Sequence, residues 1–223
     1  MLVAGVLAAS CTGGRGTVAT ARPSSSPRAS AAARAVVLQR GELPGYRSAP
    51  ALGTAGARAA LGRCLGLPGG RVADAARPFA RAGGLEVDLV VSQVTVFATA
   101  RAATGFAGAM GSQAAPSCLE PFARRALAPL ARRDGLALQA TAAVAPLAFP
   151  VPAPAGAFAY RMAVGTAATG GQPSIAVYLD LAGFAEGRAV VELETVSAGG
   201  LFPARLERRL LAALLARART RFG

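Results

Sequence analysis

The sequence predicts an α+β domain built on one curved antiparallel sheet of about five strands, with helices packed mainly on one face. Three observations lead to this prediction. Helical patterns come first and last in the chain, segments with strand-like composition fill its later half, and short turn-rich stretches separate those segments. Short connections between consecutive strands imply antiparallel pairing, because parallel strands need a long crossover. The length of 223 residues fits one such domain after a short N-terminal appendage.

The longest predicted strand, residues 85–99, is the element around which we expect the sheet to be organised. It is rich in Val, Leu, Thr and Phe and contains neither Pro nor Gly. Residues 72–82 just before it are expected to form a loop or a short helix, with Phe79 as the only large apolar anchor. Four later segments are predicted as strands: 136–149, 158–167, 175–181 and 189–197.

Helical periodicity predicts four helices: residues 55–67, 101–111, 117–133 and 203–222. The last of these is amphipathic, with Leu206, Leu210 and Leu214 on one face and arginines on the other. We therefore expect it to dock on the sheet. Glu207 falls near the middle of the apolar face, where a charged side chain is out of place.

The first residues read as a targeting signal. The apolar run at residues 2–9 is far shorter than the roughly 20 residues that span a bilayer. It ends in small residues before Cys11 and resembles a bacterial lipoprotein signal. We expect residues 1–10 to be the signal, Cys11 to carry palmitate or a similar acyl chain, and the protein to sit on the extracytoplasmic face of the cell membrane. The alternative is a frayed terminus with an unrelated cysteine.

Residues 11–34 are predicted to be a flexible tether. They are rich in Gly, Ser, Pro, Ala and Arg and contain no acidic residue. Such a composition buries too little apolar surface to fold by itself. The single folded domain is therefore expected to span residues 35–223.

The charge of the chain favours anionic partners. The net charge is +13, and because the sequence contains no Lys, all 24 basic residues are Arg. His, Asn and Trp are also missing, which we interpret as the codon bias of a GC-rich genome. A basic surface attracts lipid headgroups or acidic polymers. Nucleic acid is not expected as a partner, because aromatic residues form only 5% of the chain and the arginines are scattered.

Two cysteines remain in the predicted domain, Cys64 and Cys118. Two thiolates without any histidine do not make a zinc site, and a catalytic cysteine would also need a histidine. In an exported chain we expect a disulfide between them, the alternative being two buried thiols. No metal and no cofactor are expected.

Two acidic pairs, Glu86 with Asp88 and Glu192 with Glu194, are spaced so that each pair points to one strand face. Paired carboxylates can hydrolyse glycosides. A solvent-exposed strand face is the simpler interpretation and is the one we expect. Without His or Lys the chain cannot form Ser-His-Asp or Ser-Lys centres, and it contains no nucleophile elbow or phosphate-binding loop. We therefore expect no enzymatic activity.

Several motifs follow one another in an order seen in actinobacterial envelope proteins. They are Leu38, the segment ELPGY at 42–46, Cys64, Phe79, the segment SQVTVF at 92–97, Ala102-Ala103 and Cys118-Leu119. This order is similar to the mycobacterial LpqN-type lipoproteins and to the extracellular sensor domain of PknH-type Ser/Thr kinases. The resemblance covers about residues 38–120. It implies a non-enzymatic α+β domain outside the membrane, with a concave, partly apolar surface that binds a ligand.

Two functions are compatible with these observations. The first is a membrane-anchored envelope lipoprotein that binds an apolar or amphiphilic ligand, such as a lipid, in a cleft between sheet and helices. The side chains expected to line the cleft are Phe106, Met110, Phe158 and Met162. The second is an interaction or scaffolding lipoprotein that binds an envelope protein and no small molecule. An apolar pocket would favour the first function, and a flat apolar patch the second.

Overall fold

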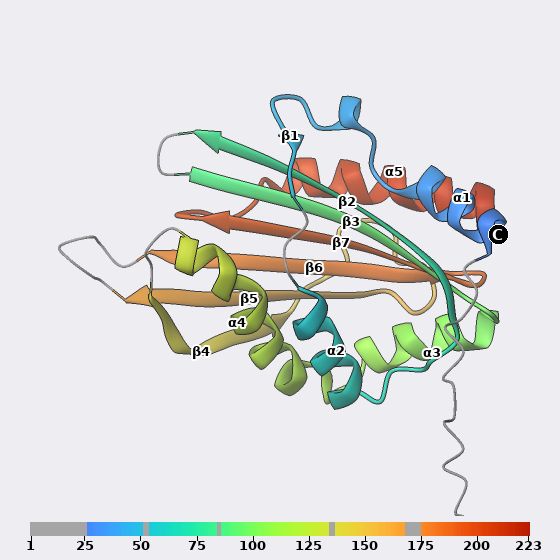
Figure 1. The fold of residues 1–223 in the computed structure, drawn as a ribbon, viewed down its shortest axis with the longest axis horizontal. Coiled ribbons are helices and arrows are strands. Elements are labelled where there is room, and N and C mark those ends of the chain that lie inside the picture. Colours follow the sequence, from blue (N-terminus) through green and yellow to red (C-terminus); the bar gives the residue numbers. More distant parts are fainter. Residues whose placement is uncertain (1–25, 51–53, 84–85, 134–136, 168–174) are drawn as a thin grey trace, which may run out of the picture.

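The computed structural model describes residues 26–50, 54–83, 86–133, 137–167 and 175–223. It confirms an α+β domain with one antiparallel sheet (Figure 1). The strands are β1 (Arg47–Ser48), β2 (Arg71–Gly83), β3 (Glu86–Phe97), β4 (Ala137–Pro146), β5 (Phe158–Ala167), β6 (Ala176–Glu186) and β7 (Ala189–Ala198). The α-helices are α1 (Pro27–Val36), α2 (Ala55–Cys64), α3 (Ala100–Met110), α4 (Ala115–Arg133) and α5 (Ala204–Phe222), with one short 3-10 helix at Arg40–Glu42.

The sheet has seven strands in the order β1-β2-β3-β7-β6-β5-β4, two more than we expected. Strands β4 to β7 form a meander, and β3 pairs with β7 to join that meander to β1 and β2. The long predicted strand is therefore internal, as expected, with β2 on one side and β7 on the other. Helices α3 and α4 carry the chain from β3 in the middle of the sheet to β4 at its edge.

The prediction of a loop or helix at residues 72–82 was wrong. The segment forms β2, which pairs with β3 along its length although its sequence is rich in Ala and Arg and contains Pro78. Pairing with a strong neighbouring strand has overridden a weak intrinsic preference. The carbonyl of Pro78 accepts a hydrogen bond from the amide of Ala49, so the Pro78 nitrogen also faces the sparsely paired β1 side, where a missing N–H is tolerated.

The prediction that helices cover mainly one face was also wrong. Figure 1 shows α1 and α5 together on one side of the sheet, while α2, α3 and α4 lie on the other. The central strands require both layers, because their side chains are apolar on both faces. Val90 and Val94 of β3 pack toward α1 and α5, whereas Leu89 and Phe97 pack toward α2, α3 and α4. A strand buried on both faces needs a helical layer on each side.

The folded domain also begins earlier than residue 35. Helix α1 starts at Pro27, and the hydroxyl of Ser26 accepts a hydrogen bond from the amide of Ala29 at its N-terminus. Ala29, Ala33 and Val36 are fully buried against the sheet and α5. Small side chains at this spacing let a helix approach its neighbours closely, which composition alone does not reveal. The predicted tether is therefore too long at its C-terminal end, while residues 1–25 lie outside the described part of the chain.

Candidate functional site

The four side chains expected to line an apolar cleft belong to the packed core. Phe106 and Met110 of α3 meet Phe158 and Met162 of β5 in the cluster between the sheet and α2, α3 and α4, and none is more than 4% exposed. None of the four lines any of the surface hollows described below. The sequence correctly placed these residues together, but they fill the space that we expected a ligand to occupy.

Small residues explain why the space is closed. Ala103 and Ala107 of α3 are buried at the contact with the sheet, so the helix lies close to it. The ring of Phe158 packs over Gly183 on the neighbouring strand, at a position where any Cβ would collide with it. The hydroxyl of Tyr160 donates to the carbonyl of Met110 at 2.8 Å and ties β5 to the end of α3.

The predicted disulfide is confirmed. Cys64 at the end of α2 is bonded to Cys118 in α4, with 5.8 Å between their Cα atoms. It fixes α2 to the longest helix of the same layer. Cys11, the predicted lipidation site, lies outside the described residues.

The expectation that the acidic pairs face solvent was wrong. Glu192 and Glu194 are only 3% and 2% exposed, and both point to the α2 side of the sheet. Nη1 of Arg58 in α2 lies 3.2 Å from Oε2 of Glu192, and Nη2 lies 2.7 Å from Oε2 of Glu194. Burial raises the pKa of Glu194, and the guanidinium of Arg58 opposes this shift. One arginine from a distant helix therefore holds both carboxylates inside the domain.

Asp88 is buried on the opposite face. It accepts hydrogen bonds from the hydroxyls of Tyr46 and Ser197 and pairs with Arg81 at 2.6 Å. Burial and the neighbouring carboxylate raise the pKa of Tyr46 to about 12. The side chain of Glu86 lies outside the described part of the structure. Asp88 thus has a structural role in joining three segments.

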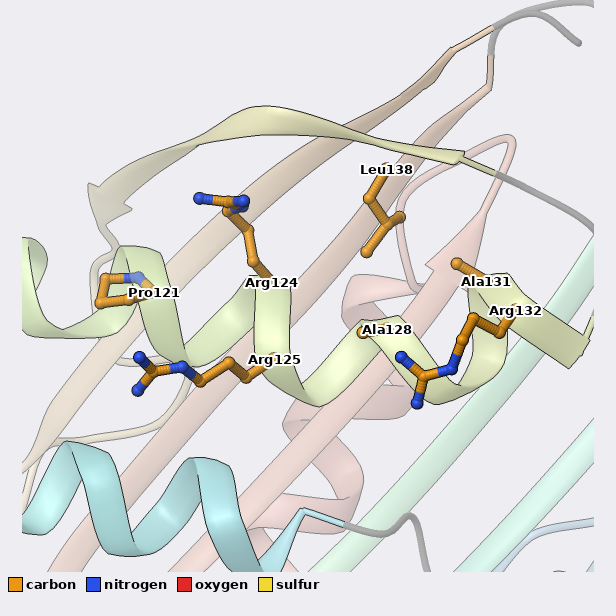
Figure 2. Close-up of a pocket in the computed structure, with 7 residues that line it drawn as sticks. All are labelled: Pro121, Arg124, Arg125, Ala128, Ala131, Arg132 and Leu138. Carbon is orange, nitrogen blue, oxygen red and sulfur yellow. The ribbon is translucent and has the colours of Figure 1, made fainter.

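A surface hollow of about 410 Å³ lies between α4 and β4 (Figure 2). It is lined by Pro121, Arg124, Arg125, Ala128, Ala131, Arg132 and Leu138; we call it the α4–β4 groove. Figure 2 shows Arg124 and Leu138 in the space between helix and strand, whereas Arg125 and Arg132, well apart from each other, extend from another side of the helix. The three guanidinium groups make no ion pair with any described residue.

A second arginine-lined hollow, about 370 Å³, lies between the segment around Tyr46 and the start of α5. Two of its three arginines are already engaged. Arg81 pairs with Asp88 and lies over the ring of Tyr46, and Arg209 donates to the carbonyl of Glu42. Arg205, which also lines this hollow, makes no ion pair with a described residue, so one unpaired arginine lies here against three at the α4–β4 groove, which we take as the candidate binding site. In the sequence, the scattered arginines were the only signal for this groove.

The described residues were also compared with the patterns of a metal site and of a membrane-spanning helix, and they match neither. No three Asp, Glu, Cys or His side chains in the described ranges gather as metal ligands would. Within the same ranges, no helix has both the length and the apolar character that crossing a bilayer requires.

The structure of this chain is similar to that of a known extracellular domain. No protein-family model matches the chain, and no curated protein matches it. The structure is similar to the crystal structure of the extracellular domain of PknH from Mycobacterium tuberculosis, with a TM-score of 0.49 and 11% sequence identity. The match covers 86% of this chain and 96% of that one. PknH-type sensor domains are one of the two groups that the sequence resembles; the resemblance to LpqN-type lipoproteins stays a prediction.

Proposed function

We propose that the chain is an exported, lipid-anchored protein of the cell envelope whose domain holds an anionic amphiphile in the α4–β4 groove, without catalysis. One observation carries this proposal. Arg124, Arg125 and Arg132 line this hollow beside Ala128 and Leu138, and none of the three forms an ion pair with a described acidic side chain. The sequence led us to expect an amphiphilic ligand between the sheet and the helices, but that space is filled. We therefore assign the ligand to the α4–β4 groove instead.

The groove combines two kinds of contact. A guanidinium group offers paired N–H donors that match the oxygens of a phosphate or carboxylate. Ala128 on the helix and Leu138 on the strand offer apolar surface beside these donors. A volume of about 410 Å³ is within the usual range for small-ligand sites. The combination suits a molecule with an anionic head and an attached carbon chain better than a free inorganic ion.

An anchor at Cys11 would place this groove near such molecules. Helix α1 begins at Pro27, 16 residues after Cys11. Even a fully extended connection of that length reaches no more than about 55 Å. The proposed ligand chemistry is that of an anionic lipid headgroup, which the membrane itself supplies.

The absence of catalysis is part of the proposal. The chain contains no His and no Lys, which removes the commonest general bases. The acidic pair that could have served hydrolysis, Glu192 and Glu194, is held by Arg58 in the interior. These observations support a binding role.

Binding of a short-chain phosphatidylglycerol below its micellar concentration tests the groove. The full chain with Cys11→Ser removes any contribution of the anchor. Replacing Arg124, Arg125 and Arg132 by Gln should weaken binding at least tenfold, which is about 1.4 kcal/mol or more. The matched control replaces three exposed arginines elsewhere, Arg34, Arg101 and Arg208, and lowers the net charge by the same amount.

The control variant should bind nearly as tightly as the parent chain. Equal weakening in both triple variants would show that only the net charge matters, and the groove would be abandoned. Short-chain phosphatidylcholine should bind much more weakly than phosphatidylglycerol. If inorganic phosphate bound as tightly as the lipid, the apolar residues of the groove would not contribute to binding, and an amphiphilic ligand would be excluded.

The anchor has its own test. Metabolic labelling with an alkyne fatty acid should tag the wild-type chain and leave Cys11→Ser untagged. Equal labelling of the two chains would overturn the lipid anchor and leave the groove proposal standing.

A second candidate function is an interaction or scaffolding protein without a small ligand. The observation that favours it is the filled interior, since Phe106, Met110, Phe158 and Met162 leave no room at the predicted cleft. Native extraction followed by mass spectrometry distinguishes the two functions. Co-purifying anionic lipid supports the groove, whereas a stoichiometric protein without lipid supports scaffolding.

A further inference from the structure

Two of the arginines that line the α4–β4 groove form separate cationic points on one side of α4. Arg125 and Arg132 are seven residues apart, which is close to two helical turns, so their side chains leave the helix in similar directions. At a rise of 1.5 Å per residue, the two positions are about 10 Å apart along the helix axis. Figure 2 shows both side chains extending toward the end of α4 that carries Pro121, so the backbone spacing also sets the spacing of the guanidinium groups.

The surface between these two points is small and apolar. Ala128 and Pro129 are each about one helical turn from both arginines, so they lie between them on the same side of the helix. Both are partly exposed, and Figure 2 shows Ala128 between the two arginines. The sequence from Pro121 to Arg132 contains no acidic residue. A short carbon chain can therefore lie between the two cations without covering a carboxylate.

Both guanidinium groups are available to a ligand. Arg125 and Arg132 are exposed, and neither forms an ion pair with a described acidic side chain. At about 10 Å their mutual repulsion is largely screened, since the Debye length in physiological salt is about 8 Å. Each of them therefore acts as a separate contact for an anion.

The spacing distinguishes ligands with one phosphate from ligands with two. Charge-assisted hydrogen bonds between a guanidinium and a phosphate are about 2.8 Å long. One phosphate contacts both arginines only if the two side chains bend toward each other, which restricts their conformational freedom. Two phosphate groups joined by a few carbon atoms contact both side chains as they stand.

We propose that the ligand of the α4–β4 groove is a lipid whose headgroup carries two phosphate groups, one bound by Arg125 and the other by Arg132, with the linking carbon atoms over Ala128. This inference rests on the proposed function of the groove and names the class of lipid. Once the first phosphate is bound, the second contact forms within the same complex, at an effective concentration in the millimolar range. Both contacts then contribute to the affinity of one molecule.

The test compares short-chain diphosphatidylglycerol, whose two phosphates are joined by a glycerol, with short-chain phosphatidylglycerol. Both are used below their micellar concentrations, with the full chain carrying Cys11→Ser at physiological ionic strength. The lipid with two phosphates should bind at least tenfold more tightly. This lipid also has more acyl chains, so the assignment to the arginines depends on single variants.

Arg125→Gln and Arg132→Gln each leave one of the two cationic points. Each variant should weaken the binding of diphosphatidylglycerol at least tenfold and that of phosphatidylglycerol about twofold at most, because a single phosphate can use the remaining arginine. Arg101→Gln, at an exposed position on α3, removes the same charge away from the groove and is the matched control. It should leave both affinities unchanged.

The results separate this inference from the proposed function. Equal weakening of both lipids by each single variant, or equal affinity of the parent chain for the two lipids, would overturn the ligand with two phosphates and leave the groove as a site for one anionic headgroup. If neither lipid bound, or if the triple replacement of Arg124, Arg125 and Arg132 changed nothing, the proposed function itself would be refuted. Glycerol 1,3-bisphosphate has no acyl chains and should bind much more weakly than diphosphatidylglycerol; equally tight binding would exclude a lipid and indicate a soluble bisphosphate.

Discussion

Glu207 should make the protein less stable as the pH rises through neutrality. It lies in the first turn of α5 but points to the apolar side of the helix and is only 7% exposed. Burial, followed by the neighbouring carboxylate of Asp180, raises the pKa of Glu207 from 4.5 to about 7. The cation that lowers this pKa, Arg161, is already committed to Asp180 through two hydrogen bonds of 2.8 and 2.7 Å. Its attraction lowers the pKa of Glu207 too little to offset burial.

The magnitude follows from linkage between protonation and folding. The folded-state pKa lies above the unfolded one, so the native state binds the proton more tightly. The destabilisation is therefore complete above about pH 7, decreases as the pH falls toward 4.5, and is absent at lower pH. At about 1.4 kcal/mol per pKa unit, the difference between 4.5 and about 7 sets an upper bound of about 3.5 kcal/mol. Partial contact with water reduces this bound, and we expect about 1–2 kcal/mol.

Glu207→Gln tests this reasoning, because glutamine imitates the protonated acid and cannot ionise. Urea denaturation at pH 8 should show a gain in the free energy of unfolding of about 1–2 kcal/mol over wild type. At pH 5 the gain should be well under half as large. Asp74→Asn, at an exposed position on β2, is the control and should not show this pH dependence. A gain of equal size at both pH values, or a loss of stability at pH 8, would refute the argument.

Three further predictions concern the stability of the fold. Replacing Cys64 and Cys118 by Ser should cost about 4 kcal/mol in the chain-entropy account, because the bond closes a loop with a sequence separation of 54; an unchanged urea midpoint would contradict this. Phe97→Ala should cost about 3–5 kcal/mol, since the ring is fully buried between β3 and the helical layer, and a midpoint within error of wild type would show that β3 does not organise the core. Gly187→Ala should cost more than about 1 kcal/mol, because this residue has a φ of 51° and its new Cβ would collide with the carbonyl of Phe222; a wild-type melting temperature would exclude that contact.

The sequence by itself determined the elements whose signal is local. Strand β5 has the bounds predicted from its composition and flanking turns, and α5 docks on the sheet through the apolar face that its periodicity defines. The pairing of Cys64 with Cys118 was also predictable, because the absence of histidine left few other uses for two cysteines. In each case the information lies within a few residues of the element or in the composition of the chain.

Tertiary structure decided which faces are covered. Strand β2 exists because β3 lies beside it, and α1 is ordered because its alanines meet the sheet and α5. The sequence of β2 has no strong strand preference of its own. Helix α1 is rich in alanine and favours a helix, but without large apolar side chains its sequence gives no sign that it packs on the sheet.

The same holds for the polar groups and for the candidate site. The spacing of Glu192 and Glu194 correctly indicated one shared face, but not whether that face meets water or a helix. The answer depends on Arg58, which lies 134 residues before Glu192 in the chain. The α4–β4 groove likewise depends on the contact between β4 and α4, which leaves a hollow lined by three arginines. Charge and spacing are properties of the sequence, whereas the partner of each charge is set by contacts between segments that are distant along it.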